Sequence, residues 1–175
     1  MLLINDKAFV PFISAETIQT RIQELADRIN QDYADKKPLL VVVLNGAFLF
    51  AADLMKNLTI SCEITFIRVA TYTATESTGQ LKQILGLSES IASRDLIVVE
   101  DIVDTGLTIC EVCDQLRAQN PASIAIATLL FKPAALTKQV ELRYVGFEIE
   151  NRFVLGYGLD YDGLGRNTKE ILVLQ

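Results

Sequence analysis

Hydrophobic residues recur along the first third of the chain in two patterns, one helical and one typical of a buried strand. Apolar positions follow a helical spacing over residues 14–33, and Ser14 is suited to cap the start of that helix. Residues 39–44 form a continuous apolar run of the kind found in strands that are buried on both faces. Asn45-Gly46 interrupts this run, and the pattern predicts a second helix over 47–56.

Segments with helical spacing and apolar runs typical of strands also follow one another in the rest of the chain. Helical spacing predicts a helix over about 106–119, and Asn120-Pro121 stops it. Residues 71–83 are rich in Thr, Ser and Gly, and we expect a long mobile loop there. Apolar runs predict further strands at 62–70, 96–100, 123–131, 144–148, 153–159 and 171–174. Strands that alternate with helices favour an α/β fold, a parallel twisted sheet with helices on both faces.

Composition narrows both the fold and the chemistry. The 175 residues suit one domain, and a net charge of -6 leaves no basic surplus for binding nucleic acid. The absence of histidine excludes imidazole catalysis, so acid–base work falls to Asp, Glu, Lys, Tyr or Cys. No apolar run approaches the roughly 18 residues that cross a bilayer, and three cysteines without framework spacing suit a reducing compartment. We therefore expect a cytoplasmic protein that binds neither membrane nor nucleic acid.

Three carboxylates cluster where the predicted strand 96–100 meets the following helix. Glu100 and Asp101 end the apolar run, and Asp104 precedes Thr105-Gly106-Leu107-Thr108. The free amides of a helix start favour an anion, and the hydroxyls and Gly106 help the backbone to hold one closely. Neighbouring carboxylates can accept hydrogen bonds from sugar hydroxyls or bind a divalent cation. The alternative is that Asp104 only caps the helix and that Glu100 and Asp101 are solvated turn residues.

The whole segment 98–108 resembles the signature of the type I phosphoribosyltransferases, which bind phosphoribosyl pyrophosphate. It has an apolar run, Glu-Asp, two apolar residues and then Asp-Thr-Gly-x-Thr. The resemblance implies one domain over 1–175, with a core at about 36–145 beneath a small hood formed by about 1–15 and 146–175. It further implies that Glu100 and Asp101 hold ribose hydroxyls or magnesium, and that Asp104 takes a proton from the purine.

The C-terminal segment 145–161, followed by Arg166, is similar to the purine-binding end of the hypoxanthine-guanine phosphoribosyltransferases. The similarity implies that Phe153 stacks on the purine and that the Val154 backbone contacts the base edge. It also implies that Asp160 binds magnesium, that Arg166 contacts pyrophosphate, and that Lys132 donates to the six-position oxygen of the base. Because a lysine only donates, such a pocket rejects adenine. Without the resemblance, Phe153 would be a core residue and the two cations would be surface charges.

Two further loops belong to the resemblance. Thr71-Tyr72 stands where the family's flexible active-site loop usually has Ser-Tyr, and threonine keeps the hydroxyl. Asn45-Gly46 stands where the pyrophosphate loop usually has Lys or Arg and then Gly, so the backbone donors remain but a positive charge is lost. The strained cis peptide of relatives would fall at Leu44–Asn45.

Together these features predict a purine-salvage enzyme. It would transfer ribose 5-phosphate from phosphoribosyl pyrophosphate to hypoxanthine or guanine with Mg²⁺ and release pyrophosphate. The transition state would resemble an oxocarbenium ion, so positioning and electrostatics should dominate. Alternatives are xanthine or another oxopurine as the base, and a regulator that binds nucleic acid, against which the net charge counts. Relatives form dimers or tetramers, so a homodimer or homotetramer is expected.

Overall fold

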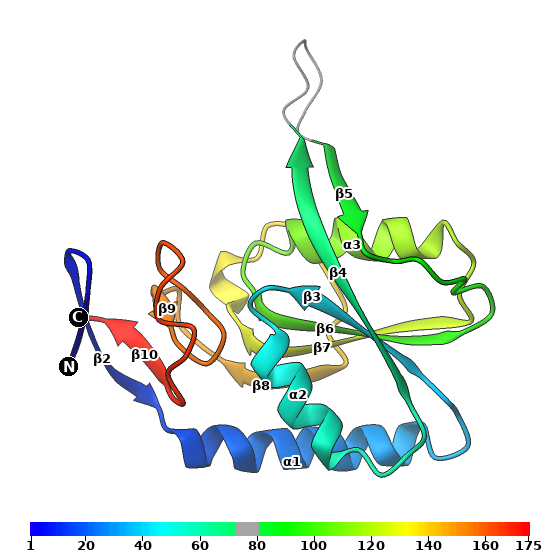
Figure 1. The fold of residues 1–175 in the computed structure, drawn as a ribbon, viewed down its shortest axis with the longest axis horizontal. Helices are drawn as coiled ribbons and strands as arrows, with labels where there is room; N and C mark the ends of the chain where they lie inside the picture. Colours follow the sequence, from blue (N-terminus) through cyan, green and yellow to red (C-terminus); the bar gives the residue numbers. More distant parts are fainter. Residues whose placement is uncertain (73–80) are drawn as a thin grey trace.

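The larger of two sheets forms the centre of the molecule (Figure 1). The computed structural model describes residues 1–72 and 81–175, and for residues 70–72 and 81–85 it describes the backbone alone. Five strands of this sheet run parallel, and β5 pairs antiparallel with β4 at one edge. In spatial order the strands are β5 (Leu81–Leu85), β4 (Glu63–Tyr72), β3 (Leu39–Leu44), β6 (Asp95–Val103), β7 (Ser123–Phe131) and β8 (Tyr144–Glu148).

Helices cover both faces of this sheet. The helices α1 (Ala15–Asp32) and α2 (Phe48–Asn57) lie on one face, and α3 (Leu107–Arg117) lies on the other (Figure 1). Successive residues of β3 are buried on opposite faces of the sheet. Leu40 and Val42 pack in the same core as α1 and α2, whereas Leu39 and Val41 pack in the core that contains α3. The predicted strand buried on both faces is therefore confirmed, and so is the parallel sheet between helices. None of the helices within the described ranges is both long and apolar enough to span a membrane.

The two ends of the chain pair in a second, smaller sheet, and we call this sheet, together with the residues at 149–170 around β9, the hood. Its antiparallel strands are, in spatial order, β1 (Leu2–Ile4), β2 (Lys7–Ile13), β10 (Ile171–Leu174) and β9 (Val154–Leu155). Figure 1 shows the blue and red ends of the chain side by side in this sheet. Hood residues such as Val154 and Ile171 belong to the same core as α1 and α2, so the hood is packed onto the main sheet.

Two predicted strand boundaries are wrong. The strand predicted at 96–100 continues through Val103, because Ile102 and Val103 pair with Leu130 and Phe131 of β7. Glu100 and Asp101 therefore lie within the strand and not in the turn after it. The strand predicted at 153–159 has only the two residues of β9, because the chain turns through left-handed conformations at residues 156–158.

The loop predicted over residues 71–83 is also partly wrong. Its first two residues end β4 and its last three begin β5, with Thr71 opposite Lys82 and Tyr72 opposite Leu81. Pairing satisfies the backbone groups that an isolated loop would leave to water. Residues 73–80 lie outside the described part of the chain. The strands β1, β2 and β5 were not predicted, and β8 crosses the core–hood boundary expected near residue 145.

Candidate active site

Two adjacent carboxylates lie near the carboxyl end of β6. Glu100 is buried, and its Oε1 accepts a hydrogen bond from the Asp101 amide at 3.1 Å. The Asp101 Oδ1 accepts from the Ile102 amide at 2.8 Å. Burial, with the neighbouring Asp101 charge, raises the pKa of Glu100 well above its ordinary value. Burial also raises the pKa of Asp101, and hydrogen bonds with Glu100 and the Ile102 amide, followed by the Arg166 charge, oppose that rise.

Asp104 and Lys132 form an ion pair between the ends of two neighbouring strands. The Lys132 Nζ lies 3.2 Å from the Asp104 Oδ2. Lys132 is only 7% exposed, whereas the Asp104 carboxylate is half exposed. The residue that caps α3 is Gly106, with φ 81° and no side-chain capping bond, so Asp104 is not the helix cap. A buried ammonium group needs a hydrogen-bond acceptor or an opposite charge nearby, and the Asp104 carboxylate supplies both.

The turn that follows Asp104 encloses a small pocket of about 90 Å³. The first bond within α3 runs from the Cys110 amide to the Gly106 carbonyl, and the Leu107 amide donates to Thr105 Oγ1 at 3.4 Å. A Cβ on Gly106 would overlap the Lys138 carbonyl, which explains why glycine stands there. The pocket can hold an anion of phosphate size. Its lining residues are Glu100, Ile102, Val103, Asp104, Thr105, Gly106, Thr108 and Ile109.

The loop after β3 lies against this carboxylate cluster. A Cβ on Gly46 would overlap the Asp101 carboxylate, and a Cβ on Gly158 would overlap the Gly46 carbonyl. The Leu44–Asn45 peptide is cis, as the resemblance implied. Asn45 Oδ1 accepts a hydrogen bond of 2.9 Å from the Arg68 Nη2. The loop thus joins β6 to the hood through backbone contacts that only glycine permits.

The hood brings a second carboxylate–cation pair to the same edge. Arg166 Nη2 lies 2.6 Å from Asp160 Oδ1, and Arg166 Nη1 donates to the Gly158 carbonyl at 2.7 Å. The Gly163 amide donates to Asp160 Oδ2 at 2.7 Å. Both carboxylate oxygens of Asp160 are therefore engaged within this part of the chain.

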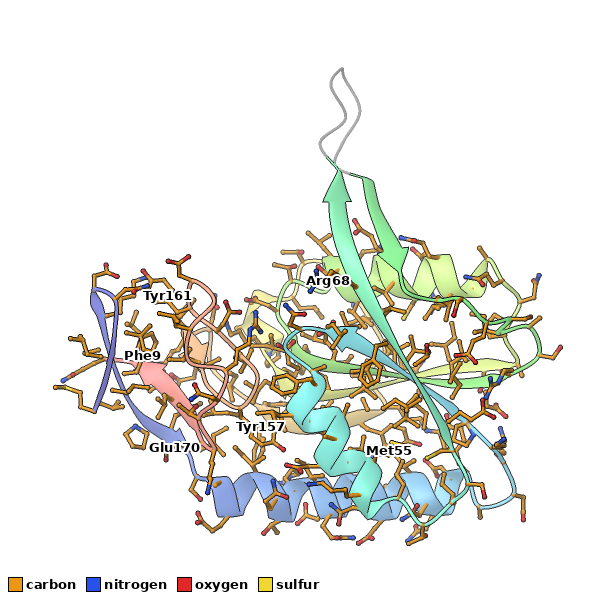
Figure 2. The ribbon with its side chains drawn as sticks, viewed as in Figure 1. Phe9, Met55, Arg68, Tyr157, Tyr161 and Glu170 are labelled. Carbon is orange, nitrogen blue, oxygen red and sulfur yellow. The ribbon has the colours of Figure 1, made fainter. Side chains whose placement is uncertain are left out.

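Phe153 lies in the hood just before β9 and keeps 41% of its surface exposed. Its ring centroid lies 5.7 Å from that of Tyr161, edge to face, and 6.1 Å from that of the buried Phe9. Lys7 lies over the same aromatic group, with its Nζ 4.2 Å from the Tyr161 centroid. Phe9 and Tyr161 are both labelled in the hood in Figure 2. A ring supported in this way and still half open suits stacking against a flat ligand. The adjoining Val154 is buried and pairs with Val173.

The described geometry brings most of the predicted residues to one edge of the sheet, with exceptions. The side chains of Thr71 and Tyr72 lie outside the described part of the chain. Among the described residues no three possible metal ligands lie together, so the Glu100–Asp101 pair and Asp160 are separate candidate positions for a cation. Glu100 and Asp101 could hold a divalent cation, because a cation would offset the repulsion between two buried neighbouring carboxylates. Sequence reasoning missed Arg68, which lies in no motif. It also gave no role to Gly158, although this glycine lies within the segment 145–161.

Comparison with known proteins agrees with this geometry. The phosphoribosyl transferase domain family matches residues 14–162. The chain is 42% identical over 166 residues to a hypoxanthine-guanine phosphoribosyltransferase of Mycobacterium bovis, covering 91% of this chain and 82% of the relative. It is 40% identical over 164 residues to that of Bacillus subtilis, covering 93% of this chain and 91% of the relative.

A solved hypoxanthine phosphoribosyltransferase of Staphylococcus aureus has the same fold. Its TM-score is 0.88 at 37% sequence identity, over 95% of this chain and 91% of that chain. The family match covers most of the chain, and the relatives in sequence and in structure agree with each other. The chain therefore belongs to the phosphoribosyl transferase domain family, among the hypoxanthine-guanine phosphoribosyltransferases.

Proposed function

We propose that this enzyme transfers ribose 5-phosphate from phosphoribosyl pyrophosphate to hypoxanthine and guanine, with Mg²⁺, in purine salvage. The observation that carries the proposal is the Asp104–Lys132 pair beside the pocket of the α3 turn. It sets a carboxylate that can take a proton and an ammonium that can donate to a base oxygen within 3.2 Å of each other.

The substrate groups follow from this arrangement. The 5-phosphate binds at the start of α3, where the helix amides and dipole favour an anion. Glu100 and Asp101 face the ribose hydroxyls. The base lies between Phe153 and Lys132, with its edge toward the Val154 backbone, and the diphosphate lies toward Gly46 and Arg166.

The reaction requires little covalent chemistry of the protein. The bond from the ribose C1 to the diphosphate oxygen breaks, and the diphosphate leaves with the electron pair. The purine nitrogen forms the new bond to C1, and Asp104 accepts the proton that the ring loses. Magnesium, held by Glu100 and Asp101 or by Asp160, would neutralise charge on the diphosphate. The positive charge that develops on the sugar is stabilised by the same carboxylates.

Lys132 sets the choice of base in this proposal. An oxopurine accepts its hydrogen bond, whereas the amino group of adenine would leave the buried ammonium and a donor facing each other. Discrimination against adenine should therefore be strong. By family resemblance we also propose a homodimer or homotetramer.

Pyrophosphate release measures the proposal directly. The enzyme is incubated with phosphoribosyl pyrophosphate, MgCl₂ and one base at a time, namely hypoxanthine, guanine, xanthine or adenine. Release with hypoxanthine and guanine, little with adenine, and loss of activity with EDTA are expected. Release with adenine alone, or with no purine, would overturn the proposed reaction.

A further inference from the structure

A guanidinium lies beside the loop that lacks a cationic side chain of its own. Asn45 is neutral, and the Arg68 Nη2 donates to its Oδ1 at 2.9 Å. Both side chains are exposed. Arg68 comes from β4, 23 positions along the chain, so the charge reaches the loop from the neighbouring strand.

Strand register holds Arg68 in this position. The strands β3 and β4 are parallel, and Leu44, the last residue of β3, pairs with Arg68. Asn45 is the next residue, so its side chain and that of Arg68 start from adjacent strands at the same edge. Figure 2 shows Arg68 beside β4, near the carboxyl end of β3. Ile67 is fully buried, and the alternation of the strand turns Arg68 to solvent.

The charge of Arg68 is not neutralised by any carboxylate in the described part of the chain, where its one side-chain bond is that to Asn45. A guanidinium has five N–H donors in a planar fork, so most of them remain for a second acceptor. Arg94 and Arg166 differ from Arg68 in this respect, since Arg94 pairs with Glu63 and Arg166 pairs with Asp160. Spare donors at the mouth of a loop suit a multiply charged oxyanion.

We propose that Arg68 is a binding residue for the diphosphate group, both in phosphoribosyl pyrophosphate and in released pyrophosphate. This rests on the proposed function, because it assumes that the diphosphate lies at the Asn45–Gly46 loop. In the bound state Arg68 donates to a terminal diphosphate oxygen, and Asn45 orients the guanidinium through the bond already present. The positive charge that the loop sequence lacks is thereby supplied from β4.

The test compares Arg68→Gln with Arg68→Lys and the wild type by calorimetric titration with inorganic pyrophosphate and MgCl₂. Arg68→Gln should weaken pyrophosphate binding by about 10- to 100-fold, since a charge-assisted bond is lost, and Arg68→Lys should lose less. Affinity for inosine 5'-monophosphate, which has no diphosphate, should stay within about twofold. Arg21→Gln in α1, whose arginine pairs with Glu24, is the matched control for charge and should bind pyrophosphate like the wild type.

A second experiment places a positive charge on the loop itself. Asn45→Lys in the Arg68→Gln background should restore pyrophosphate affinity at least in part. The inference is overturned if Arg68→Gln binds pyrophosphate within twofold of the wild type, or if it weakens the monophosphate equally. The wild type could bind pyrophosphate through Arg68 and yet form no pyrophosphate from phosphoribosyl pyrophosphate with any oxopurine. In that case the proposed function fails and the inference stands.

Discussion

Single residues in the site are constrained by backbone contacts as much as by chemistry. Gly46 touches the Asp101 carboxylate so closely that a methyl group would overlap it. Gly158 is held against the Gly46 carbonyl in the same way, with φ 101°. Asp101 therefore keeps its place only while residue 46 has no side chain.

Gly46→Ala should lower kcat/KM for phosphoribosyl pyrophosphate by about 10- to 100-fold, because Asp101 and the loop must move apart. Steady-state kinetics checks this, and urea unfolding checks that the fold persists. If Gly46→Ala keeps the kcat/KM of the wild type, the close contact between residue 46 and Asp101 does not matter for activity.

Asp104→Asn should lower kcat by about 10²–10⁴-fold, because the amide cannot accept the proton from the base. The variant keeps a carbonyl oxygen for Lys132, so binding of inosine 5'-monophosphate serves as the control for an intact pocket. Unchanged turnover would remove Asp104 from the role of general base.

Among the secondary-structure elements, α1 is tied to β8 by a polar contact at its last residue. Asp32 Oδ2 accepts from the Tyr144 hydroxyl at 2.6 Å and from Arg143 Nη2 at 2.9 Å. The Tyr144 hydrogen bond, aided by Arg143, lowers the pKa of Asp32 below its ordinary 3.8. A carboxyl group whose pKa is lowered on folding stabilises the folded state at pH values above its pKa in the unfolded chain. This stabilisation is lost as the pH falls through its pKa in the folded state.

Asp32→Asn should lower the free energy of unfolding at pH 7 by about 0.5–1.5 kcal/mol, a modest amount because water screens the pair. The difference from the wild type should shrink as the pH falls below 3.8, because the unfolded chain takes up the proton there before the folded state does. Urea unfolding at a series of pH values measures it. A difference that stays constant with pH would show that the charge of Asp32 contributes nothing.

At the scale of the whole molecule, the hood and the main sheet meet through Tyr157. Its ring is buried in the core shared with α1 and α2, and its hydroxyl bonds to Asp53 of α2. Figure 2 shows Tyr157 between the hood and α2. Because Phe153 belongs to the hood and Lys132 to the main sheet, this joint sets the width of the proposed base site.

Tyr157→Phe should lower the free energy of unfolding by about 0.5–1.5 kcal/mol and raise KM for hypoxanthine, because the bond across the joint is lost. Tyr161→Phe is the matched control for stability, since its hydroxyl bonds to Asp6 at the exposed rim of the hood and should cost less. If both variants unfold like the wild type, the hydroxyl of Tyr157 does not stabilise the joint.

Local patterns in the sequence were enough to predict the main elements. The run of β3, the helix capped by Ser14 and the strand β7 were predicted because periodicity and capping depend on neighbours a few residues away. The segment 98–108 indicated the phosphoribosyl donor for the same reason, since its phosphate pocket is built from consecutive residues.

Contacts between distant segments were decided by the tertiary structure alone. Pairing of β2 with β10 joins the two ends of the chain, and the extension of β6 through Val103 depends on partners in β7. The pairs Asp104–Lys132 and Asn45–Arg68 also cross between strands. Register and packing set which of these side chains meet, and neither leaves a local signal in the sequence. The sequence thus determined the elements and the chemistry of the donor site, and the tertiary structure decided how that site is completed.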